Sequence, residues 1–394
     1  MSNFEFLDLG IHPLANSYLK KNELKKKENK YRLKVIFDKK NYLVKVTSKF
    51  SSKKMFNNNY PYRSSMSQTM LKSFANLAKK ILKSPKNKIL EIGSNDGAFA
   101  YNFNKKKIIC VEPCNNLARI TKSRGYKTYN QYWNFNLSKK IYKENGKVDI
   151  IFSSNTLSHI KNLDKVFKSI NYILNENGIL IIEDPSLTEC IKKNTYDQFY
   201  NEHVYVFSFT SLNLILAKHN LIIFHLENIK THGGSTRYYI KKKNSKLKIK
   251  CSVFKQIAYE KKMCISKLKT YKQFSKRVYK SKINFIKIVK DLKKKNKKII
   301  GYGATAKSCT VLNFCKINYK YIDYFIDTTP EKQNKYTPGT HIPILKNVKN
   351  INPSETVFYL GAWNFLKEII KKEKKFINSG GKFLIHTPYP RIIK

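Results

Sequence analysis

The sequence predicts an α/β protein with a small N-terminal module, a central domain built on a parallel sheet, and a second α/β domain at the C-terminal end. Its 394 residues exceed the roughly 250–300 at which a single hydrophobic core stops growing. Hydrophobic residues make up 41% and aromatic residues 13% of the chain, enough for packed cores. Strand-like and helix-like segments alternate in two separate stretches, which is typical of parallel sheets covered by helices. We expect the parts to span residues 1–65, 66–245, 246–297 and 298–394.

The N-terminal module contains short strand-like pieces, YRLKVIF and NYLVKV, between turns rich in Lys, Asn and Ser. From Met66 to Leu82 the pattern changes, and apolar residues recur at the spacing of a helix. Ser84-Pro85 is expected to end that helix.

The central part alternates between strands and helices. Strands are expected at 88–93, 107–112, 148–153 and 178–185, and helices near 97–104, 115–124 and 163–175. A polar and aromatic stretch (195–208) follows, then a helix near 210–219 and the strands LIIFHLE and STRYYIK.

The third part is a lysine-rich connector with apolar residues three to four positions apart, and it predicts one or two long amphipathic helices. A second α/β series then begins with KIIGYGATAK and continues through YIDYFID, ETVFYLGAW and GKFLIHTP.

The formal net charge of +52 raises the question of a nucleic-acid partner. The lysines are spread along the whole chain, in runs from Lys25 to Lys375, and Asn, Ile, Tyr and Phe are also abundant. This pattern indicates a coding bias that fills solvated positions, so we expect no nucleic-acid partner. Such a field still attracts anionic substrates at low salt.

The sequence also predicts a cytoplasmic protein without a membrane partner. No apolar run approaches the roughly 18 residues of a membrane span, and the first ten residues are acidic where a signal peptide is basic. The seven cysteines are odd in number and form no C-x-x-C pair, which favours reduced thiols over disulfides or zinc.

The first candidate site is EIGSNDG (91–97), at the end of a predicted strand. Gly93 and Gly97 allow a tight turn and close approach of a ligand. The next strand ends in Glu112, placed to accept hydrogen bonds from the two hydroxyls of a ribose. The glycine spacing differs from that of dinucleotide sites and, with Glu112, favours S-adenosylmethionine over NAD. The expected cofactor contacts are Glu91, Gly93, Ser94, Asn95, Asp96, Gly97, Glu112, Pro113 and Asn155.

A second cluster, DQFYNEHVY (197–205), brings Tyr200, Glu202 and His203 together. A neutral histidine can remove a proton near pH 7, and a neighbouring carboxylate or phenol can orient it. The alternative is a buried polar cluster that only braces the domain. His159 follows another predicted strand and faces the same sheet edge, either as a functional or as a structural group.

Two further segments are candidates for binding a substrate. HGGS (232–235) permits close backbone approach, and Arg237 can engage a phosphate or carboxylate. For GYGATAK (301–307), the sequence does not distinguish between a phosphate-binding turn and a structural turn. The expected substrate contacts are His232, Gly233, Ser235, Arg237, Thr305, Lys307, Lys332 and His341.

These segments resemble a family of class I methyltransferases that contains the nucleotide-sugar C-methyltransferases, such as hexose C-3 methyltransferases. The matching stretches are LDLGIHPLANSYL, YPYRSSMS, LEIGSNDG, VEPCNNLA, YDQFYNEHVYVFS, HGGSTRYY, GYGATAK and IDTTPEKQNKYTPGTHIPI. The resemblance implies a central Rossmann-like sheet that binds S-adenosylmethionine and a C-terminal domain that helps to bind a nucleotide sugar. It also implies that His203 is a base beside Tyr200 and Glu202, and that Tyr62, rather than Tyr60, reaches the site.

The resemblance fails at one point. Members of this family bind zinc in the N-terminal module through two cysteine pairs, but this chain begins where the first pair would already have passed. Asp38 and Asn41 stand at the expected place of the second pair. Because structural zinc needs four ligands, we expect no metal here.

The resulting hypothesis is methyl transfer to a carbon next to a ketone on a nucleotide-linked deoxysugar, with His203 forming an enolate. Lys307, Lys332 and Arg237 would bind the diphosphate. Three alternatives remain: a nucleic-acid methyltransferase, prompted by the charge; a nicotinamide-dependent oxidoreductase that uses GYGATAK with Asp327; and a methyltransferase-like binding protein without activity.

Overall fold

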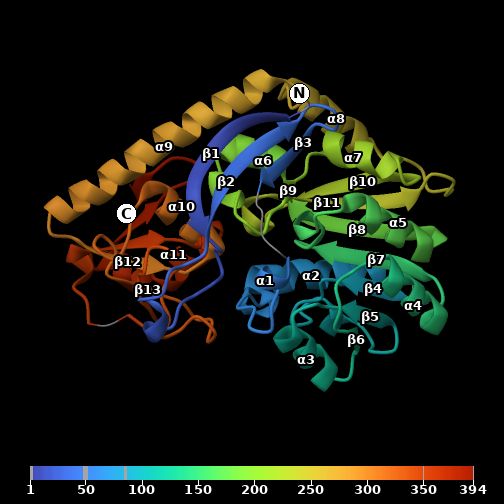
Figure 1. Cartoon of the computed structure of the whole chain (residues 1–394), viewed down its shortest axis with the longest axis horizontal. Coiled ribbons are helices and arrows are strands. Elements are labelled where there is room, and N and C mark those ends of the chain that lie inside the picture. Colours follow the sequence, from blue (N-terminus) through green and yellow to red (C-terminus); the bar gives the residue numbers. More distant parts are fainter. Residues whose placement is uncertain (1–2, 48–51, 84–86, 349, 394) are drawn as a thin grey trace.

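The computed structural model describes residues 3–47, 52–83, 87–348 and 350–393, which form three sheets (Figure 1). The expected helix end at Ser84-Pro85 lies outside the described residues. Among the described residues, no helix has both the length and the apolar character needed to cross a membrane.

The N-terminal sheet has the strand order β1-β2-β3-β9 and is antiparallel throughout. Its strands are β1 (Asn3–Pro13), β2 (Lys30–Asp38), β3 (Leu43–Thr47) and β9 (Tyr205–Val206). The sequence predicted β2 and β3 but not β1. The fourth strand comes from the central part of the chain and begins two residues after His203, so this sheet is joined to the candidate catalytic segment.

The central sheet has the order β10-β11-β8-β7-β4-β5-β6, and β11 is antiparallel to both its neighbours. The strands are β4 (Ile89–Ile92), β5 (Ile108–Val111), β6 (Lys127–Tyr129), β7 (Val148–Ser154), β8 (Leu174–Pro185), β10 (Leu221–Ile229) and β11 (Ser235–Lys242). The helices are α2 (Gln68–Ile81), α3 (Asn115–Ser123), α4 (Phe135–Asn145), α5 (Leu163–Ile173), α6 (Leu187–Lys193) and α7 (Phe209–Ala217), after the short α1 (Ser52–Met55). This arrangement confirms the predicted α/β class.

The helix predicted near 97–104 is wrong. Only a 3-10 turn, Ala100–Asn102, forms there. Gly97 has a φ of +85°, which departs from a helix, and Phe99 packs against Phe74 and Phe152 in the core under the sheet. Burial of these rings therefore shapes the segment more than its local helical spacing. The sequence also missed α4 and α6.

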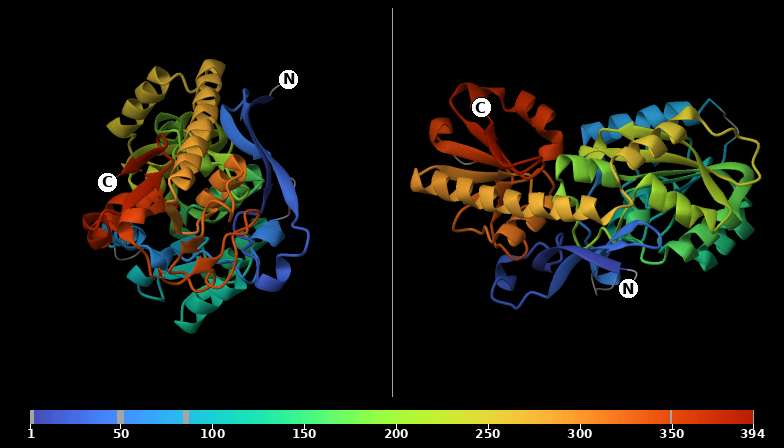
Figure 2. Two further views of the ribbon diagram at one scale, coloured as in Figure 1. Left: turned by 90° about the vertical axis from the view of Figure 1, so that its left-hand side faces the viewer. Right: turned by 90° about the horizontal axis from the view of Figure 1, so that it is seen from above.

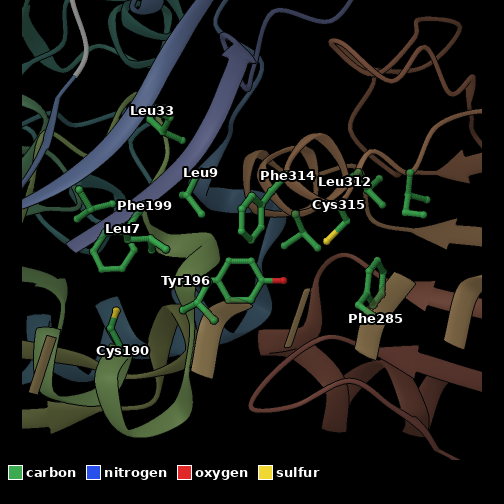
Figure 3. Close-up of a cluster of buried hydrophobic side chains, with 14 of the residues drawn as sticks. Leu7, Leu9, Leu33, Cys190, Tyr196, Phe199, Phe285, Leu312, Phe314 and Cys315 are labelled. Atoms are coloured by element: carbon green, nitrogen blue, oxygen red, sulfur yellow. The ribbon is translucent and has the colours of Figure 1, made fainter. Parts of the chain in front are cut away.

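The connector forms two helices, α8 (Cys251–Lys262) and α9 (Leu268–Lys294), as predicted. The buried residues of α9 recur every three or four positions: Tyr271, Phe274, Val278, Ser281, Phe285, Val289 and Leu292. Figure 2 shows α9 running from the central part of the molecule along the C-terminal part. One core, which includes Leu9 of β1, Phe199, Phe285 of α9 and Phe314, joins all four parts (Figure 3).

The C-terminal sheet has the order β14-β13-β12-β15-β16-β17 and is parallel except for β17. Its strands are β12 (Lys298–Tyr302), β13 (Tyr324–Ile326), β14 (Ile344–Leu345), β15 (Thr356–Leu360), β16 (Lys382–Ile385) and β17 (Arg391–Ile393). Its helices are α10 (Ala306–Cys315), α11 (Leu366–Lys372) and α12 (Lys374–Asn378). Because the sheets follow the expected parts apart from β9, we propose the boundaries near 65, 245 and 297 as domain limits.

Candidate active site

A cavity of about 540 Å³ lies where the N-terminal module, the central part and the C-terminal α/β part meet. Its walls include residues at the carboxyl ends of β4, β5 and β7 in the central sheet and of β12 and β13 in the C-terminal sheet: Ile92, Val111, Ser154, Tyr302 and Ile326. Asn16 of the N-terminal module also lines it. Ligands of open α/β sheets bind at these strand ends, so the cavity is the candidate active site.

Glu112 is fixed at the cavity wall by two backbone amides. The N–H of Asn95 donates to its Oε2 at 2.8 Å and the N–H of Cys114 donates to its Oε1 at 2.9 Å. Burial raises the pKa of this carboxyl, and the two amide hydrogen bonds oppose that shift. Each carboxylate oxygen retains a lone pair, so the group can still accept hydrogen bonds from ribose hydroxyls.

The turn after β4 approaches the neighbouring loop too closely for a side chain. Gly93 has a φ of +77°, and a Cβ there would lie 2.1 Å from Oγ1 of Thr156. Asn155, on the same loop, lines the cavity, and its buried Oδ1 has no hydrogen-bond partner among the described residues. The close turn at Gly93, the carboxylate of Glu112 that can bind a ribose, and the unpaired amide oxygen of Asn155 together fit S-adenosylmethionine.

Five of the expected cofactor residues line the cavity: Gly93, Asn95, Glu112, Pro113 and Asn155. The other four, Glu91, Ser94, Asp96 and Gly97, do not appear on its walls. Asp96 instead accepts hydrogen bonds from the hydroxyl and the backbone of Ser65, while Glu91 is buried, which raises its pKa. These four residues therefore do not form part of the cavity wall.

Replacing Glu112 with Ala is expected to weaken S-adenosylmethionine binding by about 1.5–3 kcal/mol, the scale of a hydrogen bond to a charged group. Isothermal titration calorimetry on the folded variant measures this. Glu112→Gln is the matched variant, because it keeps one acceptor oxygen for the backbone amides, and it should lose less. Unchanged affinity in Glu112→Ala would remove the adenosine assignment.

His203 is buried and both of its ring nitrogens are engaged. Nδ1 lies 2.7 Å from the carbonyl oxygen of Gln198, and Nε2 lies 2.7 Å from the hydroxyl of Tyr200. Burial lowers the pKa of His203 well below its usual value, and the nearby His159 and Lys307 lower it further. The ring is therefore neutral near pH 7, the form that can accept a proton.

Glu202 is held by two residues of the N-terminal part. The amide of Asn16 donates to its Oε1 at 2.7 Å and the hydroxyl of Tyr60 donates to its Oε2 at 2.8 Å. Burial raises the pKa of Glu202 to about 7. Tyr62 also lines the cavity, so both tyrosines reach the site. Sequence reasoning missed Asn16, although it lies in the LANSYL stretch that carries the family resemblance.

Two more histidines line the cavity, His159 and His232. In each ring the buried Nε2 has no hydrogen-bond partner among the described residues. Burial lowers the pKa of both to about 3, so they are neutral. The ring of His159 stacks on Phe56 at 5.5 Å and lies 5.1 Å from that of His203. These histidines offer uncharged hydrogen-bonding groups to a polar substrate.

The C-terminal domain contributes Thr305, Lys307 and Lys332 to the cavity. Thr305 caps α10 by accepting from the N–H of Ser308. Lys307 Nζ donates to the carbonyl of His232 at 3.1 Å. Lys332 Nζ donates to the carbonyl of Ala304 at 2.8 Å and pairs with Asp327 at 3.2 Å. Two lysines, the carboxylate of Asp327 and the N-terminus of α10 therefore line this end of the cavity. Backbone amides at a helix N-terminus are suited to phosphate.

Four expected substrate residues are not brought to the cavity: Gly233, Ser235, Arg237 and His341. Arg237 on β11 lies directly between Glu183 on β8 and Glu227 on β10, and its guanidinium pairs with both, at 3.0 and 3.3 Å. The positive charge of Arg237 is therefore neutralised within the sheet and is not presented to a substrate in the cavity.

The other three also have structural partners. His341 Nε2 lies 2.7 Å from Glu28 Oε1, and the hydroxyl of Ser235 donates to the carbonyl of Thr231 at 3.1 Å. Gly233 packs against Trp363, which a Cβ would meet at 2.2 Å. These three residues therefore take part in hydrogen bonding and packing inside the protein and do not form part of the cavity wall.

Asp38 and Asn41 occupy a turn stabilised by charge. Asp38 pairs with Lys45 at 2.6 Å and accepts from the N–H of Lys40 at 3.0 Å. In residues 3–47 and the other described ranges, no group of three or more His, Cys, Asp or Glu could hold a metal ion. The absence of zinc stays a prediction: elemental analysis of purified protein should give far less than one zinc per chain. A stoichiometric metal that survives dialysis against chelator would contradict it.

Comparison with known proteins gives two domain matches. Residues 62–226 match a methyltransferase domain, and residues 230–388 match the C-methyltransferase C-terminal domain. The C-methyltransferase NovU of Streptomyces niveus is 28% identical over 307 residues, which cover 77% of this chain and 73% of that protein.

Solved structures include a SAM-dependent methyltransferase of Thermotoga maritima, described as a possible histamine N-methyltransferase. It is 20% identical with a TM-score of 0.35, over 45% of this chain and 90% of that one. A SAM-dependent methyltransferase of Clostridium acetobutylicum is 15% identical with a TM-score of 0.34, over 43% and 91%. The two domain matches and the relative together indicate that the chain is an S-adenosylmethionine-dependent methyltransferase.

Proposed function

We propose that this enzyme methylates a carbon next to a ketone on a nucleotide-linked deoxysugar, through an enolate formed with His203 as base. One observation carries the proposal: a single cavity is lined by Glu112, by the neutral His203 and by Lys307 and Lys332. These groups suit, in turn, a ribose, an acidic carbon–hydrogen bond and a diphosphate. The match of residues 230–388 to a C-methyltransferase domain supports carbon as the acceptor.

The chain's residues have separable tasks in this reaction. When bound, S-adenosylmethionine supplies an electrophilic methyl group on sulfur. His203 takes the proton from the carbon beside the ketone, and the negative charge moves to the ketone oxygen. His159 or a tyrosine hydroxyl would donate a hydrogen bond to that oxygen. Holding both reactants in line could supply about 7–11 kcal/mol of the barrier reduction.

The C-terminal domain would bind the nucleotide part of the substrate. Lys307 and Lys332 are cations beside the N-terminus of α10, whose amides and dipole favour a phosphate group. Arg237 is paired with Glu183 and Glu227 within the central sheet and does not line the cavity, so the diphosphate ligands in this proposal are Lys307 and Lys332.

The test is incubation with methyl-labelled S-adenosylmethionine and a panel of acceptors. The panel contains nucleoside-diphosphate keto-deoxysugars, the same sugars with the ketone reduced to an alcohol, and RNA. We expect label on a carbon of a keto sugar and none on its alcohol, because only the ketone stabilises the carbanion. Label on RNA, or equal label on the alcohols, would contradict the proposal.

A further inference from the structure

The two hydrogen bonds of His203 define where its proton-accepting electron pair points. A carbonyl oxygen can only accept a hydrogen bond, so the contact of Nδ1 with the Gln198 carbonyl places the ring hydrogen on Nδ1. The lone pair of neutral His203 is therefore on Nε2. That atom lies 2.7 Å from the hydroxyl of Tyr200, which must be the donor in this bond.

The hydroxyl of Tyr200 occupies this lone pair. Its side chain lines the cavity, with 9% of the residue exposed, and its ring centroid lies 4.0 Å from that of His203. Burial raises the pKa of Tyr200, and the nearby Glu202, Tyr62 and Asp197 raise it further. The phenol is thus protonated and keeps donating to His203.

We propose that Tyr200 relays the substrate proton to His203, a step that rests on the proposed function. The carbon–hydrogen bond beside the ketone breaks, its electron pair forms the enolate, and the proton goes to the oxygen of Tyr200. In the same step the phenol's own proton moves to Nε2 of His203. Tyr200 ends neutral, and the products are an enolate and an imidazolium.

Charge balance favours a concerted relay over a free phenolate. A phenolate at Tyr200 would be destabilised by burial and by the nearby carboxyl of Glu202. Transfer of the phenol's proton to His203 in the same step as proton uptake leaves no charge on Tyr200. Burial, His159 and Lys307 disfavour a lone imidazolium, but the enolate formed in the same cavity is its counter-charge. Gln198 holds Nδ1–H throughout.

The test measures exchange of the substrate's α-proton with deuterated water, with S-adenosylhomocysteine bound so that no methyl can move. The probe is a nucleoside-diphosphate 4-keto-6-deoxyhexose. The exchange rate of Tyr200→Phe should be lower than that of wild type by a factor of about 10²–10⁴, and so should that of His203→Asn. Fluorinated tyrosines at position 200 keep the ring and the hydrogen bond but change the acidity of the phenol, and the exchange rate should follow that acidity. The same residues at Tyr389, which is 62% exposed, should have no effect.

Two results would overturn the relay while leaving the base in place. These are exchange by Tyr200→Phe within a few-fold of wild type while His203→Asn is inactive, or a rate that ignores fluorination at position 200. Exchange by His203→Asn at the wild-type rate, or no exchange by wild type, would instead contradict the proposed function itself. A merely positional tyrosine would give fluorinated variants of equal rate.

Discussion

His203→Asn should lower turnover by about 10²–10⁴, the usual contribution of a positioned general base. The residue accepts a proton and contacts neither a phosphate nor a ribose, so the affinities for both ligands should stay within a few-fold. Single-turnover kinetics and calorimetry measure the two effects separately. His159→Asn should cost less, because His159 would orient the substrate or stabilise the enolate.

The pH dependence of the wild-type enzyme provides a second readout for His203. Burial lowers the pKa of this side chain well below its usual value, so the neutral base persists as the pH falls. The acid limb of kcat/KM should therefore lie below the roughly 6.5 expected of an unperturbed histidine. A matched control is His219→Asn, which should leave turnover unchanged because His219 lies beside Asp164 and does not line the cavity. If His203→Asn retains full turnover, Tyr62 or Tyr200 becomes the candidate base.

Arg237→Met should destabilise the protein by about 3–5 kcal/mol, because it leaves a buried carboxylate without its partner. Arg237 is 3% exposed and Glu183 is fully buried, and their contact is 3.0 Å. Urea unfolding monitored by circular dichroism gives the change in the free energy of unfolding.

The control for this prediction is Lys34→Met, which breaks the exposed pair of Lys34 with Glu5. A surface pair contributes at most about 1 kcal/mol, so this variant should be close to wild type. If Arg237→Met leaves stability unchanged but raises KM for the substrate, Arg237 binds the substrate and the prediction is wrong.

The sequence predicted those features that depend on local pattern. Apolar runs located most of the parallel strands of both domains, although they missed β6 and β14. Strand ends pointed to Glu112, Asn155 and His159, which all line the cavity. The role of Arg237 could not be predicted in the same way, because its partners depend on the register of β11 with β8 and β10. His341 is likewise paired with Glu28, more than 300 positions away in the chain.

Contacts between residues that are distant in the chain could not be predicted from local sequence patterns either. Asn16 contacts Glu202 only because β1, β3 and β9 bring the N-terminal loop across the central domain. A helix was expected near 97–104 because its apolar spacing resembles a helix, yet the aromatic core beneath the sheet controls that segment. Long-range packing thus decided both cases.

The pairing of β3 with β9 joins the N-terminal sheet to the central part of the chain through backbone hydrogen bonds. Val44 and Lys45 are in register with Val206 and Tyr205, and the N–H of Val46 donates to the carbonyl of Val204 at 2.9 Å. The backbone that follows His203 is therefore hydrogen-bonded to the N-terminal module, which also carries Asn16. Deleting the N-terminal module would therefore leave β9 without its partner strand and would remove the hydrogen bond from Asn16 to Glu202.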